Sequence, residues 1–222
     1  MARRLPMQLS LPAPRTWGGR RIGAGRKPAH PRPNVSHAPR PAHDPRHPVH
    51  VTLRAARGLK SLRSEPAFQA LSLAFAAASR EGFRVVHFSV QTDHVHLIVE
   101  ADTGDGLRAG INGLSGRMAR ALNRIWHRSG AVWSDRYHSR ALATPREVRN
   151  GLVCVLLNFR KHLRAAPGID PRSSGAWFDG WSHNPTPPTK PCPVAPARTW
   201  LATSGWRRAG RPIGTHEAPG TK

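Results

Sequence analysis

The chain has 222 residues, of which 35 are Lys or Arg and only 12 are Asp or Glu, and the formal net charge of +23 indicates a polyanionic partner. Nucleic acid is the first candidate, whereas a membrane surface is weaker because no basic amphipathic helix stands apart from the rest. Two cysteines give no disulfide framework or CxxC pair, and prolines interrupt the N-terminal region where a signal peptide needs an apolar core. We therefore expect a cytoplasmic, nucleoid-associated protein.

Residues 1–46 form a basic segment with ten Lys or Arg residues, one acid and almost no large apolar side chains. Such a segment buries too little surface to offset its ordering entropy, so we expect a disordered arm. Its Gly-rich part, residues 18–28, resembles a minor-groove arm, but a solvated tail that only raises the local DNA concentration is the simpler interpretation. Its candidate DNA contacts are Arg20, Arg21, Arg26 and Lys27.

Alternation of apolar and polar residues predicts a first strand over residues 47–54. Apolar residues at helical spacing then predict a helix that begins near Ser64 and ends before Gly82. Residues 84–90 and 94–100 read as two further strands joined by a short turn. We expect this hairpin to form the centre of the sheet.

The second strand of that hairpin carries a His-x-His motif. Alternation directs Val95 and Leu97 to one face of the sheet, and His94 and His96 to the other. Two neighbouring imidazoles are a natural start for a divalent-metal site, although a third ligand must come from elsewhere. The simpler interpretation of an isolated His-x-His in a histidine-rich chain is that both residues are merely exposed.

A stripe of apolar residues over 107–125 predicts a second helix with one face in the core. Arg117, Arg120 and Arg124 occupy its remaining surface, either as a solvated face or as phosphate contacts. Residues 131–142 predict another strand, although the alternation there is poor.

Thr144 and Glu147 form a capping box at the start of a last helix, which we expect to run to about Leu163. A polar stripe on this helix places Cys154 and Asn158 one turn apart. That stripe becomes important if it faces the histidine pair.

The remaining residues, 166–222, are rich in Pro and Gly, and we expect an extension with at most one short helix near 198–208. Trp next to Arg suits base stacking there, but a Trp that docks the extension onto the domain is the commoner use and the one we favour. The fold that these elements predict is α+β: a ferredoxin-like antiparallel sheet over 47–165, with helices on one face and a DNA-binding face on the other.

The segments 92–99, 133–139 and 155–158 resemble the HUH single-tyrosine transposases, and the REP-associated tyrosine transposase branch in particular. The resemblance implies that His94, His96 and Asn158 hold Mg²⁺ or Mn²⁺. It also implies a homodimeric mobile-element protein that binds single-stranded or hairpin DNA and cuts and rejoins strands through a covalent phosphotyrosine. Arg136, Arg160 and Lys161 are further candidate DNA contacts.

The nucleophile of that family is a tyrosine on the last helix, four residues before the third metal ligand, and here the position is Cys154. The only tyrosine of the chain, Tyr137, is the less favoured alternative because its strand position is more simply structural. Two other functions stay open: a catalytically inactive binder of hairpin DNA, and an RNA-binding basic protein without a metal.

Overall fold

The structure, a computed structural model, describes residues 40–163, 168–183, 185–186 and 188–220, with only the backbone given for residues 161–163. Most of the predicted basic arm, including Arg20, Arg21, Arg26 and Lys27, therefore lies outside the described residues.

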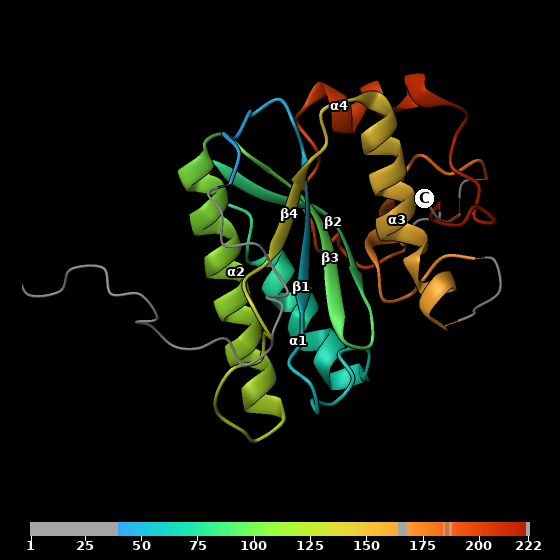
Figure 1. The fold of residues 1–222 in the computed structure, drawn as a ribbon. Helices are drawn as coiled ribbons and strands as arrows, with labels where there is room; N and C mark the ends of the chain where they lie inside the picture. The colour runs from blue at the N-terminus through green and yellow to red at the C-terminus, as the bar shows by residue number, and fades with distance from the viewer. Residues whose placement is uncertain (1–39, 164–167, 184, 187, 221–222) are drawn as a thin grey trace, which may run out of the picture. The chain divides into compact units, whose positions relative to one another are not determined.

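Four antiparallel strands form one sheet in the order β2-β3-β1-β4 (Figure 1). With the helices α1 and α2 between them, the strands follow each other as βαββαβ, and this confirms the predicted α+β, ferredoxin-like class. The centre of the sheet is the pair β1 and β3, whereas β2 is an edge strand, so the expectation of a central β2–β3 hairpin was wrong. The elements are β1 (Val49–Arg54), α1 (Glu65–Ala76), β2 (Phe83–Val90), β3 (His94–Ala101), α2 (Gly104–Ile125), β4 (His138–Ala141) and α3 (Pro145–Leu163).

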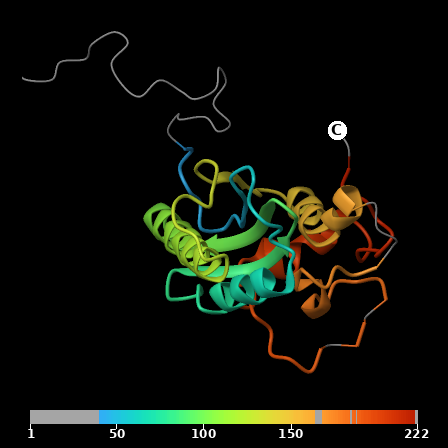
Figure 2. The same ribbon diagram turned by 90° about the horizontal axis from the view of Figure 1, so that it is seen from below.

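Helices cover both faces of the sheet rather than one. Figure 1 shows α1 and α2 on one side of the strands and α3 on the other, and Figure 2 gives the same separation from below. Val95, Leu97 and Val99 pack in the core cluster that contains α1 and α2, as the alternation predicts. Ile98, on the opposite face of β3, packs in a second cluster with α3. Two cores exist because the sheet is apolar on both sides over part of its area.

The predicted strand over 131–142 is mostly irregular, and only its end forms β4. Trp133 makes a single bridge to Ala55, after which the Asp135 carboxylate accepts the backbone N–H of Arg136 at 2.7 Å. A side chain that bonds a neighbouring backbone group in this way competes with strand pairing.

The start of α3 is the predicted capping box. The Glu147 N–H donates to the Thr144 hydroxyl at 3.2 Å, and the Glu147 carboxylate accepts the Thr144 N–H at 3.2 Å. This reciprocal pair fixes the first residue of the helix and therefore which residues follow on its faces.

The C-terminal extension is packed and not disordered over the residues that the structure describes. It contains two short 3-10 helices, η1 (Ser174–Trp177) and η2 (Gly205–Ala209), and one turn of α-helix, α4 (Trp200–Thr203). Trp181, Trp206 and Ile213 are buried in the same cluster as α3. Widely spaced apolar side chains therefore anchor this Pro-rich segment, although its composition alone would predict an unstructured chain. None of the described helices is both long enough and apolar enough to span a bilayer.

Candidate DNA-processing site

An open cavity of about 440 Å³ lies where the His-x-His strand faces α3. Residues far apart in the sequence meet in it because β1 pairs with β3 in a register that sets Thr52 opposite His96 and Arg54 opposite His94. Cys154 and Asn158 reach it from α3, so the polar stripe predicted on that helix does face the histidines. The lining residues are Thr52, Arg54, Asp93, His94, His96, Cys154 and Asn158.

The two imidazoles lie side by side in this cavity, with ring centroids 4.7 Å apart and planes at 88°. His94 is oriented by its neighbour Asp93, whose carboxylate oxygen lies 2.7 Å from Nδ1. A carboxylate that accepts the Nδ1 proton leaves the lone pair of the ring on Nε2, the usual arrangement behind a metal-binding histidine. Although partial burial acts to raise it, the pKa of Asp93 is lowered by the hydrogen bond from His94 and by the charges of His94 and Arg54.

His96 is oriented from β1 in a similar way. Its Nδ1 lies 3.1 Å from the Thr52 hydroxyl and 3.1 Å from Nε2 of His50. Burial, and then the nearby charges of His138 and Arg140, lower the pKa of His50 to about 4, so His50 is neutral at physiological pH. A neutral ring can accept the Nδ1 proton of His96, which again directs the Nε2 lone pair of His96 away from β1.

Asn158 supplies an amide oxygen on the opposite wall. Asn158 is only 4% exposed and lines the same cavity as the two histidines. A buried amide is costly to leave unsatisfied, so its position on the cavity wall suits a polar ligand.

These three side chains fit a divalent cation. The described residues contain no group of three or more His, Cys, Asp or Glu that could hold a metal, so a site here needs the amide oxygen as its third protein ligand. Two imidazole nitrogens and one amide oxygen suit Mn²⁺, and Mg²⁺ would take further ligands from water or phosphate oxygens.

Cys154 lies between this cavity and a second one of about 430 Å³ that continues along α3. The second cavity is lined by His50, Arg140 and Arg149 from the domain, and by residues 217–220 of the extension. Arg140 is paired with Glu147 at 2.7 Å and Arg149 with Glu217 at 2.8 Å. Cys154 is therefore half-buried and lines both cavities.

Comparison with known families agrees with this geometry. Residues 46–147 match the model of the IS200-like transposase family, a stretch that includes both histidines and the strands that position them. Over this stretch, which is slightly less than half of its length, the chain is similar to the IS200-like transposases. The matched stretch ends in the first turn of α3, before Cys154 and Asn158.

Among solved structures, the chain is similar to a REP-associated tyrosine transposase bound to a REP hairpin. The two share 18% sequence identity with a TM-score of 0.48, and the alignment covers 58% of this chain and 74% of the other. No curated protein matches the sequence.

The only tyrosine of the chain, Tyr137, is not among the residues that line the histidine cavity. Tyr137 is 7% exposed and packs in the core cluster of α1 and α2, on the other side of the sheet. The Arg40 guanidinium lies 3.6 Å from its ring centroid and donates to its carbonyl oxygen at 2.7 Å. These contacts support a structural role, and they argue against Tyr137 as a relocated nucleophile.

The predicted DNA contacts on the helices are not gathered at the cavity. Arg117, Arg120 and Arg124 are exposed on α2, which covers the opposite face of the sheet. Arg160 instead holds the extension, because its guanidinium donates to the carbonyl oxygens of His216 and Glu217. These contacts give Arg160 a docking role for the extension, and its contact with DNA stays a prediction. Arg136 is half-buried, and the Lys161 side chain lies outside the described residues.

The prediction missed Thr52, Arg54 and His50. A signal was available, since these three residues occupy every second position of the first predicted strand and therefore share one of its faces. Without the β1–β3 register, however, nothing in the sequence says which residues of β3 they meet.

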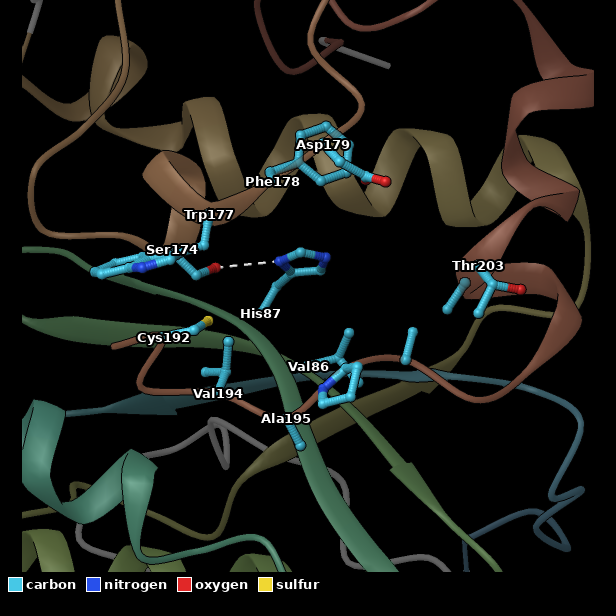
Figure 3. A pocket seen from close by; sticks show the side chains of 13 residues that line it. Val86, His87, Ser174, Trp177, Phe178, Asp179, Cys192, Val194, Ala195 and Thr203 are labelled. Atoms are coloured by element: carbon cyan, nitrogen blue, oxygen red, sulfur yellow. Dashed lines mark hydrogen bonds between the residues drawn. The ribbon is translucent and has the colours of Figure 1, made fainter. Parts of the chain in front are cut away.

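A further cavity of about 440 Å³ lies between β2 and the extension (Figure 3). His87 enters it, with Nδ1 3.2 Å from the Ser174 hydroxyl, and lies edge-on to Phe178. Burial lowers the pKa of His87 to about 4, against the opposing charges of Asp179 and Glu100. The walls are largely apolar and include no Lys or Arg, so this cavity is poorly suited to phosphate.

Proposed function

We propose that this chain binds single-stranded or hairpin DNA at the histidine cavity and holds Mg²⁺ or Mn²⁺ there through His94, His96 and Asn158. The observation that carries the proposal is the meeting of His94, His96, Cys154 and Asn158 in one cavity, although α3 and β3 are separated by α2 and β4 in the chain. The family match supports DNA as the substrate, and the net charge of +23 supports a polyanion. When bound, the cation would polarise the scissile phosphate.

The residues of the chain have distinct tasks in this proposal. Asp93 and Thr52 orient the two imidazoles through Nδ1, and Arg54, whose side chain is 72% exposed, offers a charge to a phosphate at the rim of the cavity. Cys154 stands where the family resemblance puts the nucleophile. A thiolate is a soft nucleophile and a poor match for a phosphodiester, so we propose that the wild type is weak or inactive in strand cleavage.

The geometry for strand cleavage survives in this proposal even though the tyrosine is missing. In Cys154→Tyr, a phenol oxygen would form a bond to phosphorus, the bond from phosphorus to the 3′ oxygen would break, and that oxygen would leave as a 3′-OH. Overpacking would cost about 1 to 3 kcal/mol in a closed core, but position 154 opens into two cavities, which lowers the cost.

The experiment is incubation of the full chain with end-labelled hairpin DNA and Mn²⁺, scored on denaturing gels for a covalent protein–DNA band. We expect no band or a weak one for the wild type, a strong band for Cys154→Tyr, and none for Cys154→Phe, which matches the ring without the hydroxyl. If Cys154→Tyr folds, binds the hairpin and Mn²⁺, and still forms no adduct, the catalytic assignment of this helix is wrong.

The cysteine itself favours a second function, a non-enzymatic binder of the same DNA. Hairpin binding by the wild type without cleavage products would support that function, and preference for RNA of the same sequence would contradict both. The homodimer that the family resemblance implies is tested by light scattering of the full chain.

A further inference from the structure

Trp200 stands out among the tryptophans that the structure describes because half of it is exposed. Its exposed fraction is 50%, and within the described residues Leu73 is the other large apolar side chain on the surface. Trp181 and Trp206, from the same extension, are buried as anchors. The expected docking role is therefore filled by those two residues, and the exposure of Trp200 needs another reason.

The backbone that carries Trp200 is held rigidly by a buried carboxylate. Glu100, 1% exposed near the end of β3, accepts the backbone N–H of Arg198 at 2.9 Å and that of Thr199 at 3.0 Å. It also accepts the Thr199 hydroxyl at 2.8 Å and the Arg84 guanidinium at 3.1 Å. Four hydrogen bonds to one buried charge fix the start of α4, so the indole projects from a preorganised support.

One side of the indole is also set by packing. A Cβ on Gly205 would lie 2.8 Å from two carbon atoms of the six-membered ring, so the ring rests directly on this glycine. Phe or Ala at position 200 would leave that support intact, whereas a side chain at Gly205 would displace the ring.

The surroundings of the indole are cationic. Trp200 and Arg198 line a cavity of about 630 Å³ together with Arg46, His47 and Arg84. The Arg208 guanidinium lies 5.1 Å from the centroid of the indole ring. Arg46 and Arg84 are neutralised by Asp44 and Glu100, but Arg198 and Arg208 make no ion pair within the part of the chain described by the structure. An exposed indole between uncompensated cations is the arrangement that binds single-stranded nucleic acid by stacking and phosphate contact.

The cavity of Trp200 approaches the second cavity just before α3 begins. The second cavity, which shares Cys154 with the histidine cavity, is lined by Leu142, and the next residue, Ala143, lines the cavity of Trp200. His94 and Glu100 lie on the same strand, six residues apart and hence about 20 Å along it. A single strand a few nucleotides long spans that distance.

We propose that Trp200 stacks an unpaired nucleobase of the DNA strand that enters the histidine cavity, and that Arg198 and Arg208 contact its phosphates. The inference rests on the proposed function, because it takes single-stranded DNA as the ligand. It adds a second contact that lies in the extension, outside residues 46–147, which match the transposase family.

The test compares two strands on the full-length chain by fluorescence anisotropy: a labelled thymine homopolymer, and an abasic strand with the same number of phosphates. Trp200→Ala should weaken binding of the thymine strand about tenfold and leave the abasic strand unchanged, since stacking needs a base. Trp200→Phe should keep most of the affinity. Arg198→Gln should weaken both strands and reduce the slope of log affinity against log salt by about one. Leu73→Ala, at the other exposed apolar side chain, is the matched control and should change neither.

Equal affinity of the wild type and Trp200→Ala for the thymine strand would overturn the inference, as would an equal loss on both strands. Either outcome leaves the proposed function standing, because the wild type still binds DNA. A wild type that binds neither strand also overturns the inference, whereas the proposed function fails only if the hairpin DNA is not bound either.

Discussion

Nδ1 of His94 lies 2.7 Å from the carboxylate of Asp93, and the same carboxylate is paired with Arg54 at 3.0 Å. The turn between β2 and β3 thus orients the first histidine of the motif before the strand begins. A carboxylate behind a histidine fixes its tautomer and raises its basicity toward a metal.

Replacement of that carboxylate should weaken metal binding without abolishing it. Asp93→Asn should lower Mn²⁺ affinity by about 10- to 100-fold, and the double variant His94→Ala/His96→Ala should abolish binding. Titration calorimetry measures both, with Asp105→Asn on the exposed start of α2 as the control. Equal affinity for the wild type and the double variant would show that the histidines are not ligands.

The basic arm should contribute affinity but not selectivity. Residues 1–39 hold eight Lys or Arg and no acid, whereas Arg40 and His43 already contact the domain through Tyr137 and the Ala101 carbonyl. Removal of residues 1–39 should flatten the salt dependence of DNA binding and preserve the preference for a hairpin, since contacts between cationic side chains and phosphates add affinity without reading the bases. Binding isotherms over a salt series are the measurement. An unchanged slope, or a lost preference, would contradict this division.

Acid should destabilise the chain through His87. Its pKa falls from 6.5 in the free side chain to about 4 in the folded chain, so the unfolded state binds more protons between these values. The contribution of His87 to the free energy of unfolding is therefore complete above about pH 6.5. It is lost as the pH falls toward 4, and the loss is roughly 3 kcal/mol. Urea unfolding measures this free energy. Between about pH 6.5 and 4, the unfolding free energy of His87→Gln should fall by roughly 3 kcal/mol less than that of the wild type.

The comparison isolates His87 because the other groups are common to both chains. His50 contributes in the same window, and the carboxylates with lowered pKa values, such as Glu147 and Glu217, contribute at lower pH. Parallel curves for the wild type and His87→Gln would mean that His87 is protonated in the folded state at its ordinary pH.

Replacement of the buried Glu100 should destabilise the fold. Glu100→Ala leaves the Arg84 guanidinium, 8% exposed, without its closest carboxylate, and removing one partner of a buried pair costs about 3 to 5 kcal/mol. The control is Glu65→Ala, since the Glu65 side chain is 58% exposed in its pair with Arg172, and the expected loss is below about 1 kcal/mol. Urea unfolding measures both, and limited proteolysis should cut Glu100→Ala faster within residues 198–220. Similar losses in the two variants would contradict the anchoring role of Glu100.

Local patterns in the sequence determined most elements and one half of the site. The period of two in β3 places His94 and His96 on one face, because successive strand side chains point to opposite sides. The capping box of Thr144 and Glu147 sets the start of α3, and helical spacing then places Cys154 and Asn158 one turn apart. Each of these depends only on residues close in the chain.

Only the tertiary structure decided which of these faces meet. The register that brings Thr52 to His96, and the packing of α3 against the histidine face, join residues about 40 to 60 positions apart, and no short-range period encodes such a pairing. The same long-range packing places Tyr137 in the core on the opposite side of the sheet. It also directs the Arg160 guanidinium to a carbonyl oxygen of the extension. Composition marked that extension as unstructured, but a few buried side chains such as Trp206 are enough to hold it, because burial depends on where a side chain docks and not on how polar its neighbours are.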